Sequence, residues 1–142
     1  MFLVNNEKEG AQARLLDLKM VNSNDENEVQ SQLKDFLREH VSNSQQIDLF
    51  LLGENGDSRL LKYYNACETA VSANTCIGRF KHAFGEFQTV SALALWLACH
   101  AIQHQKIPAH FIKHGSPSVL NRILIYNNYQ GLQHGFLLIE KV

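Results

Sequence analysis

Proline is scarce in this sequence, and Pro108 and Pro117 are the only two in 142 residues. Proline-rich or low-complexity stretches mark many linkers between domains, and the sequence has neither. Its length is usual for one domain and allows about two-thirds of the unfolded surface to be buried. We therefore expect a single domain that spans residues 1–142.

An excess of charge of one sign is also lacking, since 13 basic residues are matched by 14 acidic residues and the net charge is -1. Binding to nucleic acid or to an anionic membrane needs a basic field, which this balance does not supply. The most apolar run, residues 90–99, is shorter than the roughly 20 residues that cross a bilayer. The expected partners are small molecules or proteins, not nucleic acid or membrane.

Cysteine is limited to Cys67, Cys76 and Cys99, an odd number without CxxC spacing. Such a set favours free thiols in a reducing compartment over a disulfide framework. The first ten residues, MFLVNNEKEG, lack the basic region and apolar core of a signal peptide. We expect a cytoplasmic protein.

Hydrophobic periodicity predicts strands that alternate with helices. Apolar residues at helical spacing follow the potential cap residues Asn24 and Asp25 and continue to about His40. A second helix is expected to open near Asp57 and to run through Cys67. The predicted strands cover residues 2–4, 13–21, 47–53, 74–80, 121–129 and 135–142. This order is typical of an α/β sheet, whose ligand is expected beyond the carboxyl ends of the strands.

A long apolar helix is predicted from Phe87 to Gln105. Its residues are apolar on nearly all sides and form no continuous polar face. An amphipathic helix covers one side of a core, whereas a helix without a polar face is typical of a buried position. We expect this helix to be buried and covered on more than one side.

Three histidines at the end of this helix invite comparison with a zinc site. His100, His104 and His110 have the separations of four and six residues that are found in the zincin pattern. That chemistry also needs a Glu beside the first His and a Gly before the last, but these positions hold Ala101 and Ile107. We therefore expect solvent-facing histidines, and neither a metal nor another cofactor.

The segment KHAFGEFQTVSALALWLA, residues 81–98, is followed at residues 105–108 by QKIP. It resembles the carboxyl-terminal half of β-ketoacyl synthases of the thiolase-like superfamily. These have a Lys, then Gly-His, a buried helix rich in small residues and an Ile-Pro exit. Lys81, Gly85 and Ile107-Pro108 match this pattern. The family's catalytic His corresponds to Glu86, where this sequence departs from it.

Two other segments follow the family order. IDLFLLGENGD, residues 47–57, corresponds to a family strand that ends in His-Gly-Thr and is followed by an Asp. The second catalytic His is therefore also absent, and Asn55 and Asp57 lie in this turn. NNYQGLQHGFLLIE, residues 127–140, corresponds to the glycine-rich loop between the last two family strands, with Tyr129, Gly131 and His134 at matching positions.

The resemblance implies one thiolase-like half-domain with a five-stranded mixed sheet. It implies catalytic positions for Glu86 and Lys81. The implied substrate-binding residues are Asn55, Asp57, Gly85, Tyr129 and His134. The implied function is acyl condensation of the fatty-acid or polyketide type. This chain is expected to be inactive alone, because a complete ketosynthase carries its nucleophilic Cys in an amino-terminal half. An acyl carrier protein or a Cys-bearing ketosynthase chain is the implied partner.

Alternatives remain for the site and for the whole chain. Glu86 precedes the apolar helix, so it is either a structural cap at the positive end of the helix dipole or part of a substrate pocket. Asn55-Gly56 is typical of a tight turn as well as of a ligand loop. The chain is alternatively a non-catalytic interaction subunit that pairs with a ketosynthase-like chain or with itself, in a hetero- or homo-oligomer.

Overall fold

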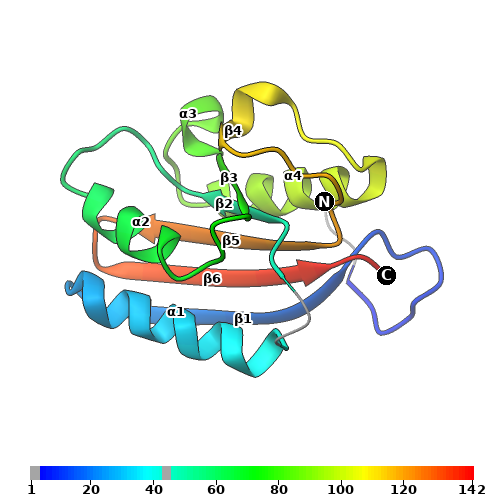
Figure 1. Cartoon of the computed structure of the whole chain (residues 1–142), viewed down its shortest axis with the longest axis horizontal. Coiled ribbons are helices and arrows are strands. Elements are labelled where there is room, and N and C mark those ends of the chain that lie inside the picture. Colours follow the sequence, from blue (N-terminus) through cyan, green and yellow to red (C-terminus); the bar gives the residue numbers. More distant parts are fainter. Residues whose placement is uncertain (1–3, 43–45) are drawn as a thin grey trace.

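Six strands form one mixed sheet, in the order β1-β6-β5-β2-β3-β4 (Figure 1). The computed structural model describes residues 4–42 and 46–142. The strands are β1 Arg14–Asn22, β2 Leu49–Leu52, β3 Cys76–Arg79, β4 Ile112–His114, β5 Arg122–Tyr129 and β6 Gln133–Glu140. The helices are α1 Glu26–His40, α2 Leu61–Glu68, the one-turn α3 Lys81–Phe84 and α4 Val90–His104, and a 3-10 turn covers Ala109–Phe111. The predicted α/β class is confirmed.

The middle of the sheet is parallel. Strand β2 pairs in parallel with β3 on one side and with β5 on the other, so that Leu51 lies between Gly78 and Ile125. All four residues of β2 are buried, as the continuous apolar run at 47–53 predicts. Because these three strands run in the same direction, the segments that follow them meet at one edge of the sheet.

The first helix forms where the sequence predicts it. The carboxylate of Asp25 accepts a hydrogen bond from the backbone N–H of Asn27 at 2.9 Å and thereby caps α1. The predicted start of the second helix is wrong, because α2 begins at Leu61. The Asp57 carboxylate instead accepts a hydrogen bond from the N–H of Arg59 at 3.0 Å, which stabilises a turn ahead of the helix.

Two hydrophobic cores lie on opposite faces of the sheet. Helices α1 and α2 cover one face, where Phe36 and Tyr64 pack on alternate residues of the central strands such as Phe50. Helix α4 covers the other face, where Ala98 packs on the intervening residues such as Leu51. This alternation is the period of two that places successive strand residues on opposite faces.

The sheet has six strands, whereas the family resemblance implies five. The additional strand, β4, pairs antiparallel with β3 through Ile77–His114 and Gly78–Ile112. A strand of three residues is too short to produce a recognisable alternation in the sequence. Of the strand predicted at residues 2–4, residues 2 and 3 lie outside the described part of the chain, and Val4 is not in a strand.

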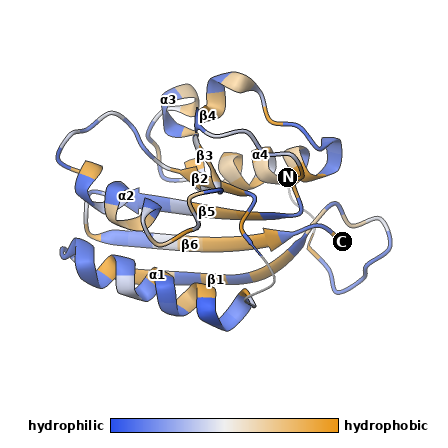
Figure 2. Ribbon diagram, in the orientation of Figure 1, coloured by the Kyte–Doolittle hydropathy of each residue, from blue (hydrophilic) through white to orange (hydrophobic). Residues whose placement is uncertain are grey.

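The expectation that the helix from Phe87 to Gln105 is covered on more than one side is wrong for this chain. Helix α4 packs on the sheet along one side, and its outer flank exposes Leu93 (38%) and Trp96 (51%). Figure 2 shows that most of this helix is nevertheless hydrophobic, whereas α1 alternates between hydrophobic and hydrophilic residues. Composition alone cannot distinguish a helix buried within one chain from a helix with a bare apolar flank.

No helix within residues 4–42 and 46–142 is both long and apolar enough to cross a membrane.

Candidate functional site

A lysine–glutamate pair lies at the edge of the sheet where the parallel strands end. Lys81 lies two residues after the end of β3, and its Nζ donates hydrogen bonds to Glu86 Oε1 at 2.7 Å and Oε2 at 2.9 Å. A third hydrogen bond runs from the same Nζ to the backbone oxygen of Asn128 at 2.8 Å. All three protons of the ammonium group therefore have acceptors. The pair thus lies beyond the carboxyl ends of the parallel strands, where the sequence predicts that a ligand would bind.

Gly85 turns the chain so that Glu86 can reach Lys81. It ends the one-turn helix α3 with φ 88° and ψ 179°, a conformation that is essentially restricted to glycine. Its N–H donates to the backbone oxygen of Lys81 at 2.7 Å. The structure therefore gives Gly85 a conformational role in positioning the Glu86 carboxylate.

Asn55 links the loop after β2 to the same carboxylate. Its Nδ2 donates to Glu86 Oε2 at 2.9 Å, while its Oδ1 accepts from the N–H of Asp57 at 3.0 Å. Asn55 thus forms a side-chain turn with Asp57 and also contacts Glu86. The carboxylate of Glu86 is held by one ammonium and one amide, and its side chain retains 38% exposure.

The two partners of the ion pair differ in how far they are buried. The Lys81 side chain has no exposed surface, and desolvation lowers its pKa, although the hydrogen bonds and charge of Glu86 oppose this shift. Gly53 allows this close packing, because a Cβ there would lie only 3.1 Å from Lys81 Cε and 3.0 Å from Asn127 Oδ1. The ammonium of Lys81 is buried and the carboxylate of Glu86 is half-exposed, so the polar site is accessible from the side of Glu86.

An apolar groove with a volume of about 470 Å³ lies beside Glu86. Its walls are β1, β5, β6 and the beginning of α4. The residues that line it are Leu18, Met20, Glu86, Phe87, Gln88, Ser91, Ala92, Leu95, Ile125, Asn127, Tyr129, Gln133, Gly135, Phe136 and Leu137. Glu86 is the one charged residue in this lining. We call the cluster of Lys81, Glu86 and Asn55 the carboxylate site. The hollow beside it is called the apolar groove.

The structure does not bring Asp57 or His134 into the carboxylate site. Asp57 pairs with Arg59, whose hydrogen bonds lower the pKa of Asp57 to about 2. His134 is fully buried on the opposite face of the sheet. Its Nε2 donates to the backbone oxygen of Ser23, and its Nδ1 therefore accepts from the hydroxyl of Tyr126, both at 2.8 Å. Burial lowers the pKa of His134.

Tyr129 lines the apolar groove and is 37% exposed, and its hydroxyl accepts a hydrogen bond from Gln130 at 3.3 Å. Gly131 belongs to the turn after it, with φ 68°. A Cβ on Gly131 would lie 3.2 Å from Tyr63 and from Leu60, so this glycine permits close packing on α2. Tyr129 is thus near the site, whereas Gly131 has a structural position.

Two asparagines at the end of β5 were not predicted as site residues: Asn127 lines the apolar groove, whereas Asn128 contacts Lys81 through its backbone oxygen. Asn127 Oδ1 and Asn128 Nδ2 are buried and have no hydrogen-bond partner among the described residues. An unpaired buried polar atom costs free energy, and a functional role is one of the explanations for its presence in a native structure. The signal in the sequence was two consecutive polar residues at the end of an otherwise apolar strand.

The cysteines lie away from the carboxylate site. Cys67 is fully buried, and desolvation raises its pKa to about 12. Cys76 is also buried, and Cys99 is ten residues into α4, about 14 Å along the helix from its first residue. Burial raises the pKa of both of these thiols. None of the three is placed as a thiolate nucleophile next to Glu86.

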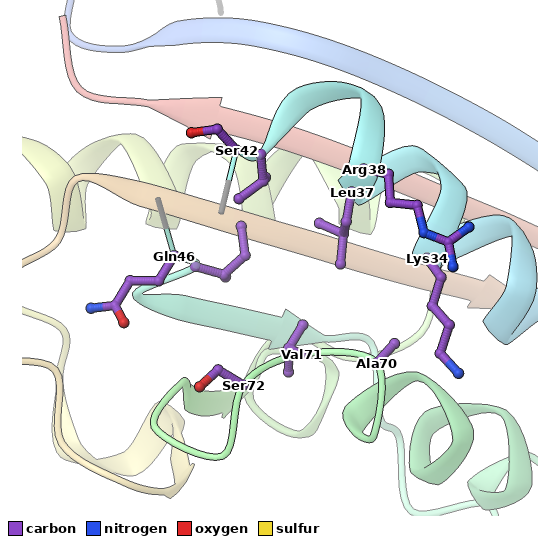
Figure 3. Close-up of a pocket in the computed structure, with 10 residues that line it drawn as sticks. Lys34, Leu37, Arg38, Ser42, Gln46, Ala70, Val71 and Ser72 are labelled. Carbon is purple, nitrogen blue, oxygen red and sulfur yellow. The ribbon is translucent and has the colours of Figure 1, made fainter. Parts of the chain in front are cut away.

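A second hollow, of about 420 Å³, opens between the end of α1 and the chain near residues 46–47 and 70–72 (Figure 3). Its apolar wall includes Leu37 and Val71, and Lys34 and Arg38 stand at its edge. Arg38 pairs with Asp35 at 2.7 Å. None of the residues predicted for the site lies here, so we assign the site to the apolar groove.

Histidines 100, 104 and 110 do not assemble into one metal centre. Within the described part of the chain, no group of three or more His, Cys, Asp or Glu residues is arranged to hold a metal ion.

Comparison with known proteins gives a match in fold alone. No protein-family model matches the sequence, and no curated protein matches it. The oxazolomycin ketosynthase domain OzmH KS8 of Streptomyces albus JA3453 matches with a TM-score of 0.72 and 10% identity, over 92% of this chain and 45% of that chain. A second structure, AntDE:AntF, is a type II polyketide synthase acyl-carrier protein in complex with its ketosynthase bound to the hexaketide. It matches with a TM-score of 0.64 and 12% identity, over 92% of this chain and 34% of that chain.

This chain has a thiolase-like ketosynthase fold. It spans less than half the length of the two ketosynthase structures. The resemblance inferred from the Lys81–Pro108 pattern is therefore confirmed for the fold.

Proposed function

We propose that this chain is a ketosynthase-like half-domain that contributes the carboxylate site to polyketide-type or fatty-acid-type acyl condensation and is inactive alone. The observation that carries the proposal is the position of Glu86, which is held by Lys81 and Asn55 and lines an apolar groove, in a chain that spans less than half of the ketosynthases it matches. The groove provides apolar surface for an acyl chain, and Glu86 provides a proton acceptor at its end.

The absence of a suitably placed thiolate supports inactivity of the isolated chain. Acyl condensation by the ketosynthase route needs a nucleophilic cysteine, and Cys67, Cys76 and Cys99 lie away from Glu86 with raised pKa values. We propose that a Cys-bearing ketosynthase-like chain supplies this group. An acyl carrier protein is the proposed donor of the acyl substrate.

The exposed walls of the apolar groove support pairing with such a chain. Leu18 is 52%, Met20 62% and Phe87 42% exposed, and all three line the groove. On β1 the apolar residues Leu18 and Met20 thus point to the face that α4 leaves open, whereas Asp17 pairs with His40 of α1. A stable interface buries about 800 Å² on each partner, and apolar residues form its centre.

The test compares acyl condensation by this chain alone and by its mixture with a candidate Cys-bearing ketosynthase-like chain, using acyl-carrier-protein substrates. We expect product only from the mixture, and turnover by the isolated chain would contradict the proposal. Glu86→Gln is expected to abolish most of the turnover of the mixture. Glu39→Gln, at the exposed end of α1, serves as the matched control.

A second candidate function is that of a non-catalytic subunit. It is favoured by the saturated hydrogen bonding of Lys81, which is consistent with a structural link between the ends of β3 and β5. In this case the complex forms and Glu86→Gln leaves its turnover unchanged. Light scattering of the isolated chain tests for self-association.

A further inference from the structure

The outer flank of α4 carries a pair of histidines that the proposed function does not use. The ring centroids of His100 and His104 are 4.2 Å apart, and both residues are exposed. In the described structure neither imidazole has a hydrogen bond or an ion pair to another side chain, so its ring nitrogens are free to bind a ligand. Their spacing of four residues brings side chains together on one side of a helix.

Trp96 extends the same flank by one turn. Its ring stacks on His100, with centroids 5.5 Å apart and an interplanar angle of 24°. His104 is the last residue of α4 and lies at the negative end of the helix dipole. A cation beside these two imidazoles is therefore favoured by the helix dipole as well as by the ring nitrogens.

We propose that His100 and His104 together chelate one divalent transition-metal ion of the class that includes Cu²⁺, Ni²⁺ and Zn²⁺. Neutral imidazole is a preferred ligand of these ions, whereas Mg²⁺ and Ca²⁺ prefer oxygen ligands. The two imidazoles fill two coordination positions, and water fills the others. Among the three ions, Cu²⁺ binds most tightly because it stands highest in the Irving–Williams order.

His110 is not part of this site, although the zincin spacing includes it. Its ring packs on Phe111, with centroids 4.3 Å apart, and it does not cluster with the other two histidines. The site is therefore a two-histidine site without the Glu and the third ligand of a metallohydrolase. It lies on the flank of α4 that bears Trp96, whereas Ser91 and Leu95 line the apolar groove.

The test uses Trp96, the single tryptophan of the chain, as its reporter. Titration of the whole protein with Cu²⁺ is expected to quench Trp96 fluorescence with one equivalent bound. Calorimetric titration with Cu²⁺ and Zn²⁺ measures the affinity directly, because substitution of His100 also changes the surroundings of the reporter. His100→Ala and His104→Ala are each expected to weaken Cu²⁺ binding by at least about tenfold, since each removes one of the two ligands.

His110→Ala is the matched control and is expected to bind Cu²⁺ with unchanged affinity. All three histidines are exposed, so the folds of the variants can be compared by circular dichroism before the titrations. An absence of saturable binding to the wild-type chain would overturn the proposal. So would equal affinities of the wild-type chain and the His104→Ala variant, or a loss in His110→Ala as large as in His100→Ala.

Discussion

Lys81 donates hydrogen bonds to both carboxylate oxygens of Glu86, although the lysine side chain is fully buried and the glutamate side chain is 38% exposed. The two partners therefore differ in what happens when the other is removed. A carboxylate left without its partner can be hydrated from the groove, whereas a buried ammonium cannot. This asymmetry makes the pair both a structural link and the most testable feature of the site.

Glu86→Gln is expected to lower the free energy of unfolding by about 1–3 kcal/mol, because it leaves the buried ammonium of Lys81 without its anionic acceptor. Lys81→Met is expected to cost less, since the remaining carboxylate is accessible to water. Urea unfolding of both variants and of the double variant measures this. A larger loss for Lys81→Met than for Glu86→Gln would show that burial does not set the asymmetry.

Gly85→Ala is expected to destabilise the protein by about 1–3 kcal/mol, because an alanine rarely adopts φ 88° with ψ 179°. Space does not cause this loss, since no atom lies within 4 Å of an added Cβ. Thermal unfolding measures the change. A variant as stable as the wild type would mean that the turn before Glu86 relaxes without cost.

Leu18→Gln and Met20→Gln are expected to reduce self-association and the binding of a hydrophobic dye, since both side chains form exposed walls of the apolar groove. Their effect on the free energy of unfolding should stay within about 0.5 kcal/mol, as at other exposed positions. Leu132→Gln, which removes a 54% exposed leucine outside the groove, is the control. Light scattering that shows equal effects for all three substitutions would contradict a specific role of the groove.

The stability of the protein is expected to fall as the pH decreases from 7 to 5, because His134 is buried in its neutral form. Its pKa is lowered in the folded state by desolvation, so the unfolded chain binds a proton first when the pH falls through about 6.5. Urea midpoints at the two pH values measure the loss. His134→Gln should have a smaller dependence on pH than the wild type, and the exposed-site variant His100→Gln should retain it. Parallel slopes for wild type and His134→Gln would contradict this assignment.

Much of the site could be located from the sequence because its residues follow strands. Lys81, Asn55 and Tyr129 each come soon after an apolar run, and parallel strands bring their carboxyl ends to one edge. His134 could not be excluded in this way. It is only five residues beyond Tyr129, but the alternation along β6 directs it to the face covered by α1 and α2.

The type and order of most elements are local properties, since periodicity, caps and turn residues act over a few positions. Helix α1 with its Asp25 cap and the buried strand β2 illustrate this. Three features depend on contacts between distant segments. They are the pairing of β4 with β3, the bare outer flank of α4 and the buried contact of Lys81 with Glu86 and Asn128. An apolar side chain has the same preference for burial whether or not a neighbour is there to bury it. The sequence alone therefore does not decide which surfaces are covered, and this depends on how the sheet and helices assemble.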